Sequence, residues 1–177
     1  MELQNCIETR RSIRAFNDTN VSDEIIATLV DAAKYAPSWK NTQVTRYYAV
    51  KSADVKSKIL DAMPDFNQPA CKSAPVIIIS SVVKERSGYN RQGEFDSPKG
   101  KGWQMYDCGC SNMLFTLKAN ELGLGTVIMG LYDEAAIANI IDLPETEEIV
   151  SIIALGYYDA APEMPKRKGS DIILKTL

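Results

Sequence analysis

The chain has 177 residues, of which 45% are apolar and 24% charged, and these values fit one folded domain over residues 1–177. Its net charge of −3 excludes the global positive field that would hold a nucleic acid or draw the chain onto an anionic membrane. The start lacks a signal-peptide pattern and no apolar run approaches the length of a membrane span, so we expect a cytoplasmic protein.

The first half of the chain predicts three helices and two strands. A helix is expected over residues 2–11 and is followed by an irregular basic loop. Ser22 is the expected N-cap of a second helix that ends before a proline. A strand is expected over Tyr47–Val50, and Ser52 begins a short helix. The next strand, Val76–Ile79, is β-branched and apolar on both faces, which predicts a central strand covered on both sides.

The second half begins with a long loop over Lys84–Gly102, rich in charge and glycine and a candidate for a mobile lid. The longest helical pattern follows over Trp103–Leu122, with Gly123 at its C-terminal end, and predicts a central buried helix. The remaining expected elements are a strand over Thr126–Met129, a helix over Glu134–Ile141, a buried strand over Ile149–Leu155 and an extended end over Asp171–Leu177. Strands and helices alternate irregularly, which favours an α+β fold.

Histidine is absent, which excludes Ser-His and Cys-His nucleophile pairs and imidazole metal sites. The four cysteines are too irregularly spaced for a disulfide framework, so we expect free thiols. Cys108 and Cys110 would point apart on a helix, and no metal site is expected. A cofactor that carries its own reactivity suits such a chain.

Two basic groups lie near opposite ends of this acidic chain. Arg10-Arg11-Ser12-Ile13-Arg14 places three guanidiniums and a hydroxyl where a phosphate could bind. The same arginines could instead complement the C-terminus of a helix and be solvated. Pro165-Lys166-Arg167-Lys168 could be a solvated tail, or could converge with the first group on one anionic ligand.

Two further segments favour contact with a flat heteroaromatic ligand. Residues 37–43, Pro-Ser-Trp-Lys-Asn-Thr-Gln, offer amide and hydroxyl groups of the kind that the edge of such a ring requires. A plain helix-stop loop explains Pro37 and Ser38 equally well, but Trp39 less readily. In Gly123–Gly130 a strand follows the glycines, so this is not the dinucleotide fingerprint, although the glycines permit close approach to a ring.

These four groups, in this order, resemble the nitroreductase family of FMN enzymes over nearly the whole chain. The matching pieces are R-R-S-I-R, A-P-S-x-x-N-x-Q, a helix carrying Asp107-Cys108-Gly109 and Asn112, then E-L-G-L-G-T, and finally L-G-Y before the K-R-K tail. The resemblance implies an α+β fold, a three-layer α/β/α sandwich around a central mixed sheet, and a homodimer. It also implies FMN as cofactor, NADH or NADPH as electron donor and a small organic acceptor, in a ping-pong mechanism.

The resemblance also implies which residues bind the cofactor. The basic segment and the tail would hold the phosphate and ribityl chain, and Arg14 would also stabilise negative charge on the reduced flavin. Asn67 would face the pyrimidine edge, and the end of the Gly-rich strand would pack near the ring, while the polar segment from Pro37 would come from the other subunit. The complete candidate set is Arg10, Arg11, Ser12, Arg14, Pro37, Ser38, Trp39, Asn41, Gln43, Asn67, Ile128, Met129, Gly130, Arg167 and Lys168, with Arg11 placed at the solvated helix end.

No side chain is expected to be catalytic, because FMN carries the chemistry. The chain departs from the family in having Val44 and Thr45 where proline and tryptophan often follow the glutamine, and in its short 84–102 loop. Enone reduction, reductive dehalogenation and flavin binding without turnover remain alternatives, and a purely structural interaction domain explains the residue groups least well.

Overall fold

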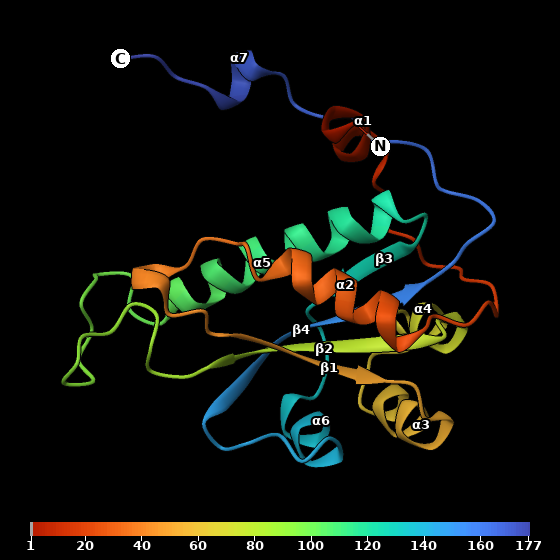
Figure 1. The fold of residues 1–177 in the computed structure, drawn as a ribbon, viewed down its shortest axis with the longest axis horizontal. Coiled ribbons are helices and arrows are strands. Elements are labelled where there is room, and N and C mark those ends of the chain that lie inside the picture. Colours follow the sequence, from red (N-terminus) through yellow and green to blue (C-terminus); the bar gives the residue numbers. More distant parts are fainter. Residues whose placement is uncertain (1) are drawn as a thin grey trace.

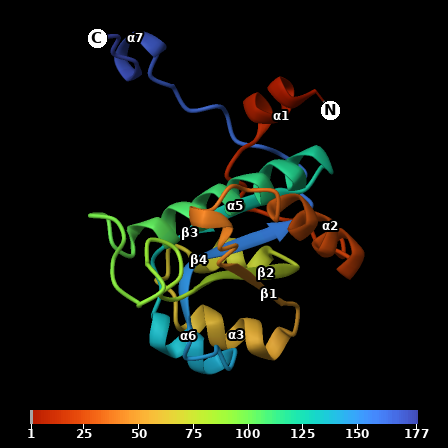
Figure 2. The same ribbon diagram turned by 60° about the vertical axis from the view of Figure 1, so that its left-hand side comes forward.

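The computed structural model describes residues 2–177, in which helices pack on both faces of a four-stranded sheet (Figures 1 and 2). The helices are α1 Leu3–Thr9, α2 Asp23–Ala33, the short 3-10 helix η1 Trp39–Asn41, α3 Ala53–Asp61, α4 Gln68–Ser73, α5 Gly102–Glu121, α6 Glu134–Ile140 and α7 Ser170–Ile173. The strands are β1 Thr45–Val50, β2 Val76–Val83, β3 Gly125–Met129 and β4 Glu147–Gly156. This architecture confirms the expected α+β class.

The sheet has the strand order β1-β2-β4-β3, and each strand is antiparallel to its neighbours. The apolar strands β2 and β4 take the two central positions, with Ile78 opposite Ile153, so the central place expected for Val76–Ile79 is confirmed. The parallel pairing expected of a mixed sheet is limited, within residues 2–177, to an isolated bridge between Ser12 and Thr126. That bridge attaches the basic segment to the edge strand β3.

Alternate residues of the central strands enter two separate cores. Val76 and Ile78 of β2 pack beneath α2 and α5, whereas Ile77 and Ile79 pack against α3, α4 and α6. All four side chains are fully buried, and each such burial stabilises the fold by roughly 1.5–3 kcal/mol. The helices on both sides of the sheet make the three-layer α/β/α sandwich that was expected (Figure 2).

Local signals placed several element ends correctly. The hydroxyl of Ser22 accepts a hydrogen bond from the Ile25 N–H at the start of α2, as an N-cap does. Gly123 follows α5 with a φ of +79°, the left-handed conformation that glycine adopts freely. The expected extended end over Asp171–Leu177 was wrong, because α7 spans Ser170–Ile173, and α4 was not foreseen at all.

Helix α5 buries a different face from the one its apolar pattern suggested. Tyr106 and Met113, one heptad apart on the same face, have exposed fractions of 64% and 47%. Its buried polar residues are Gln104, Asp107, Asn112, Thr116 and Asn120. Asn112 is accommodated by hydrogen bonds to the sheet below, because its amide donates to the hydroxyls of Ser80 at 3.0 Å and Ser151 at 3.2 Å. The helix is therefore central but leaves an apolar stripe uncovered.

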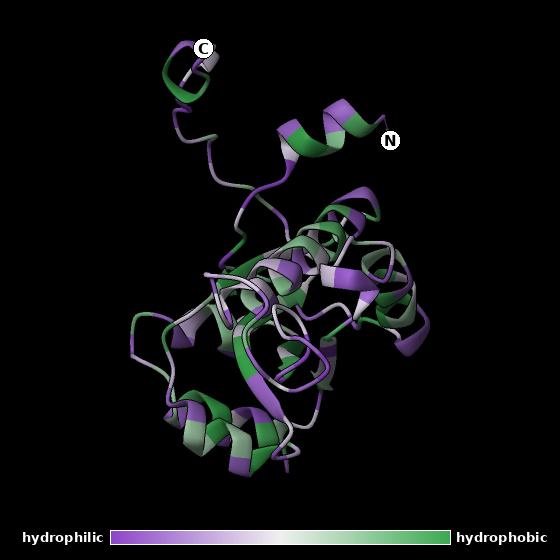
Figure 3. Cartoon of the chain, turned by 90° about the vertical axis from the view of Figure 1, so that its left-hand side faces the viewer, coloured by the Kyte–Doolittle hydropathy of each residue, from purple (hydrophilic) through white to green (hydrophobic). Residues whose placement is uncertain are grey.

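The C-terminal segment after β4 runs away from the body of the fold, and every residue from Asp159 onward is exposed (Figures 1 and 3). Its short helix α7 carries Ile172 and Ile173, with exposed fractions of 60% and 72%. Among the helices of residues 2–177, none is both long and apolar enough to cross a membrane.

Candidate functional site

The basic segment is held against β3 by its main chain. The N–H of Ile13 donates to the carbonyl of Thr126 at 3.0 Å, next to the Ser12–Thr126 bridge. The Ile13 side chain is buried over Gly125, where an added Cβ would lie 2.5 Å from Ile13 Cγ1. Gly125 therefore permits this close packing, which is a different role from the ring contact that the sequence suggested for the glycines. Fixing Ile13 leaves the neighbouring polar side chains directed away from the core.

The two basic groups come close to each other in space. Burial lowers the pKa of Arg10, and the neighbouring positive charges of Arg167 and Arg11 lower it further. Among residues 2–177, none of the ion pairs involves Arg10, Arg14 or Arg167, so no carboxylate neutralises this group. Arg14, Arg167 and Lys168 are exposed. Such a group of unneutralised cations is suited to an anion.

The Arg11 side chain binds main-chain carbonyls at the end of α1. Its Nη1 donates to the carbonyls of Glu8 at 2.6 Å and Arg10 at 2.9 Å, which are free carbonyl groups at the end of α1. By contrast, Arg14 makes one longer contact, from Nη1 to the Ser12 carbonyl at 3.3 Å. The helix-end role therefore describes Arg11, and Arg14 remains available to a ligand.

The segment from Pro37 to Gln43 adopts an unusual backbone after α2. Lys40, Asn41 and Gln43 all have positive φ, at 46°, 56° and 49°. This conformation is uncommon for residues other than glycine and is often found at functional sites. The Ser38 hydroxyl accepts the Gln43 N–H at 3.0 Å, and the Gln43 amide donates to Asn41 Oδ1 at 3.2 Å. We call residues 37–43 the flavin segment, from the role that the resemblance implies.

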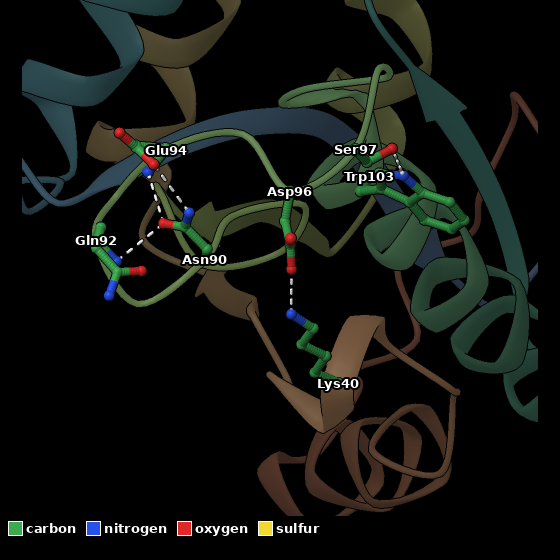
Figure 4. Close-up of polar contacts among 7 residues, drawn as sticks. All are labelled: Lys40, Asn90, Gln92, Glu94, Asp96, Ser97 and Trp103. Carbon is green, nitrogen blue, oxygen red and sulfur yellow. Dashed lines mark hydrogen bonds and ion pairs between the residues drawn. The ribbon is translucent and has the colours of Figure 1, made fainter.

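Trp39 has a partner within its own chain. Its ring packs on Trp103 at the start of α5, with ring centroids 4.9 Å apart. Its main-chain N–H donates to Oδ2 of Asp107 at 2.9 Å, while its indole Nε1 is buried without a hydrogen-bond partner. Next to it, Lys40 forms an ion pair with Asp96 of the long loop before α5 (Figure 4). The flavin segment is thus fixed to the first turns of α5 and to the preceding loop.

Asn67 and the end of β3 meet at another place. The Asn67 amide contacts the Leu131 carbonyl at 3.5 Å. Ile128 has an exposed fraction of 45%, and nothing lies within 4 Å of a Cβ placed on Gly130. Met129 is buried, with its side chain in the core beneath. These residues leave an open, partly apolar surface.

One chain does not bring all the candidate residues together. The flavin segment contacts Asp107 near the start of α5, whereas the end of α1, which leads into the basic segment, is bound by Asn120. Thirteen residues of helix separate these two positions, which corresponds to about 20 Å. The basic segment and the end of β3 lie on one side, and the flavin segment lies apart from both.

Asp107 appears in the sequence analysis only as part of a motif, and no role was predicted for it. In the structure its exposed fraction is 3%, and its Oδ2 accepts both the Trp39 N–H and the Ser87 hydroxyl, the latter at 2.6 Å. The available signal was a carboxylate inside an otherwise poorly charged helical stretch. Its partners lie 68 and 20 residues away, so no local pattern could have named them.

Comparisons with known proteins concern the sequence family and the fold of the chain. A protein of Methanothermobacter thermautotrophicus with the provisional name NADH dehydrogenase/NAD(P)H nitroreductase is 30% identical, over 89% of this chain and 78% of its own. The crystal structure of a nitroreductase family protein from Clostridium novyi NT is 25% identical, covers 90% of this chain and 86% of its own, and superposes with a TM-score of 0.78. A provisionally named nitroreductase from Exiguobacterium sibiricum 255-15 was solved in complex with FMN. It superposes with a TM-score of 0.86 over 99% of this chain and 97% of its own. Its sequence is 19% identical, so this likeness shows a shared fold. The sequence profile of the nitroreductase family matches residues 7–70 and 62–157, most of the chain, and the protein therefore belongs to the nitroreductase family.

Proposed function

We propose that this protein is a homodimeric FMN oxidoreductase that uses NADH or NADPH to reduce nitroaromatic, quinone or related small organic acceptors. Family membership supports an NAD(P)H-dependent flavin oxidoreductase, and the whole of residues 1–177 would form one FMN-binding domain. The observation that carries the proposal is the convergence of Arg10 and Arg167 without a carboxylate partner. A group of cations without carboxylate partners suits an anionic ligand, and the phosphate of FMN would supply one.

The residues on the two ends of β3 fit such a ligand. Ser12 pairs with Thr126 at the start of β3, with Arg167 and Lys168 in the tail, whereas Ile128, Gly130 and Asn67 lie towards its other end. Arg14 follows Ser12 with an exposed side chain, which would reach from the phosphate end towards the ring. Four residue steps along a strand span about 13 Å, so a phosphate at one end and a ring at the other would suit an extended molecule. The Asn67 amide would face the polar edge of the ring.

The remaining candidates would come from a second copy of the chain. Pro37, Ser38, Trp39, Asn41 and Gln43 lie about 20 Å along α5 from the end of α1, too far to share a ring with the basic segment of the same protomer. The exposed apolar stripe of α5, with Tyr106 and Met113, and the apolar side chains of the C-terminal segment are surfaces that dimerisation would cover.

Bound FMN would supply the hydride and electron transfer between the nicotinamide and the acceptor, which is chemistry that a redox cofactor carries. The protein itself would bind the flavin and orient it towards its substrates. Arg14 would place a positive charge near the ring and favour its negative form. The two substrates would use the same exposed ring face in turn, which is the basis of ping-pong kinetics.

The test is the absorption spectrum of the purified protein reconstituted with FMN, before and after anaerobic addition of NADH or NADPH. We expect tight, non-covalent FMN binding, bleaching by a nicotinamide and recovery of colour on addition of a nitroaromatic or quinone. Bound FMN that neither nicotinamide bleaches would support a flavin carrier without turnover. No flavin binding would contradict the proposal.

A further inference from the structure

Asp107 is a buried carboxylate without a cationic partner. Its exposed fraction is 3%, and no ion pair within residues 2–177 includes it. Burying an unpaired charge is costly unless N–H and O–H groups replace the lost water. Here two donors do so at one oxygen, the Trp39 N–H at 2.9 Å and the Ser87 hydroxyl at 2.6 Å. The carboxylate therefore links two segments that are distant in sequence.

The first linked segment is the flavin segment, in which three residues have positive φ. Its own hydrogen bonds lie within the turn from Ser38 to Gln43, such as those from the Gln43 N–H to the Ser38 hydroxyl and from the Asn41 N–H to the Ser38 carbonyl. The bond from Trp39 attaches the beginning of that turn to a rigid helix of twenty residues. It therefore supports an uncommon backbone conformation from outside the segment.

The second linked segment is the loop of residues 88–100, which we call the omega loop because its two ends meet. A Cβ on Gly88 would lie 2.5 Å from the Gly100 carbonyl oxygen, and Asp96 N donates to the Gly88 carbonyl at 2.9 Å. The tip is closed by Asn90, whose Oδ1 accepts the N–H groups of Gln92 and Glu94 (Figure 4). Ser87 stands directly before this loop, so its bond to Asp107 anchors one end.

Two further contacts join the same two segments. Lys40 of the flavin segment forms its ion pair with Asp96 of the omega loop (Figure 4). Trp39 packs on Trp103, whose Nε1 donates to the hydroxyl of Ser97 at 2.6 Å. The omega loop, the flavin segment and the start of α5 are thus one connected unit, in which Asp107 is a buried member.

We propose that Asp107 is a positioning residue, which holds the flavin segment in its left-handed conformation and couples it to the omega loop. It contacts no ligand itself and acts through the main chain of Trp39. The part of this inference that concerns the cofactor rests on the proposed function, because the flavin segment would contact FMN across the dimer. The part that concerns backbone order depends only on the contacts above.

The test compares four variants of the full-length protein. Asp107→Ala removes both bonds, Asp107→Asn keeps one acceptor oxygen without the charge, and Ser87→Ala removes only the bond to the omega loop. Asn112→Ala is the matched control, because Asn112 is equally buried on the same helix but bonds to the sheet rather than to either loop. Hydrogen exchange of the Trp39 amide and near-ultraviolet circular dichroism of the Trp39–Trp103 pair are read in the flavin-free protein, and FMN affinity is read by titration.

We expect Asp107→Ala to accelerate exchange of the Trp39 amide about ten-fold or more, to change the tryptophan dichroism and to weaken FMN binding by about ten-fold. Asp107→Asn should fall between this variant and wild type. Ser87→Ala should leave the Trp39 amide protected, and Asn112→Ala should lower stability without changing either local signal.

The proposal is overturned if Asp107→Ala resembles Asn112→Ala in exchange and dichroism. If Asp107→Ala does not fold, Asp107→Asn decides, and wild-type exchange at Trp39 in that variant would overturn the proposal. Failure of the wild-type protein to bind FMN would refute the proposed function, yet exchange and dichroism would still decide the role of Asp107.

Discussion

Arg11 and Arg14 lie three positions apart in the same basic segment, but their side chains make different contacts. The Arg11 guanidinium is occupied by two main-chain carbonyls at the end of α1, and the Arg14 guanidinium is exposed. A chemically identical substitution at the two positions therefore separates ligand binding from helix capping.

We predict that Arg14→Ala weakens FMN binding by about ten- to one-hundred-fold, because loss of a hydrogen bond to a charged group costs roughly 1.5–3 kcal/mol. The same change should lower the reduction potential of the bound flavin, since its negative reduced form loses a neighbouring positive charge. Arg11→Ala is the control and should alter neither quantity. Flavin dissociation constants and midpoint potentials measure the effect, and equal values for both variants would contradict it.

At the scale of the element, the sequence predicted features that depend on neighbouring residues, but not those that depend on contacts between distant residues. Ser22 and Gly123 were predictable, because a helix cap depends on a few neighbouring residues. The buried face of α5 was not, because Asn112 is tolerated in the core only through hydroxyl groups supplied by the central strands. The periodicity of the sequence gave the helix but could not indicate which of its faces would be covered.

For the candidate site, the sequence likewise indicated candidate residues but not the contacts between distant segments. The arginines and the flavin segment stand out in the sequence as polar groups, and the structure places the charge of Arg167 near enough to Arg10 to lower its pKa. Their contact with one shared ligand stays a prediction. The link between the flavin segment and the omega loop was not visible, because Lys40 and Asp96 are separated by 56 residues of unremarkable composition.

The ion pair between Lys40 and Asp96 is largely exposed, so it should hold the omega loop only modestly. Asp96→Asn should accelerate limited proteolysis within residues 88–100 by about 1.4- to 5-fold, because exposed ion pairs contribute roughly 0.2–1 kcal/mol. High salt should reduce the difference from wild type by screening the pair. Asp54→Asn, which removes the exposed pair with Lys58 on α3, is the control. Equal cleavage rates at low salt for wild type and Asp96→Asn would show that the pair does not restrain the loop.

At the scale of the whole molecule, the uncovered stripe of α5 is a departure from what a monomer requires. Apolar side chains such as Met113 are exposed on this helix, while polar side chains such as Asn112 lie on its buried face. In the proposed dimer a second copy of the chain would cover this stripe, and the C-terminal segment extends away from its own fold (Figure 1).

We predict that Met113→Glu weakens the dimer at least ten-fold, because association would bury an unpaired charge. Light scattering over a dilution series should give about twice 19.6 kDa for wild type and an approach to 19.6 kDa for the variant. Ser57→Glu introduces the same charge at an exposed position of α3, on the opposite layer, and should leave the mass unchanged. A wild-type monomer that binds FMN tightly would refute the shared site.

The length of α5 that separates the flavin segment from the basic segment has a genetic consequence. In the proposed dimer, in which each site draws on both protomers, a chain damaged only at Arg14 and a chain damaged only at Ser38 would each form an inactive homodimer. A mixed dimer of the two would concentrate both lesions in one of its sites and leave the other site intact. Two defective alleles would then complement each other within a single cell, with each mixed dimer reaching at most half of the activity of a wild-type dimer, although neither allele encodes a working enzyme.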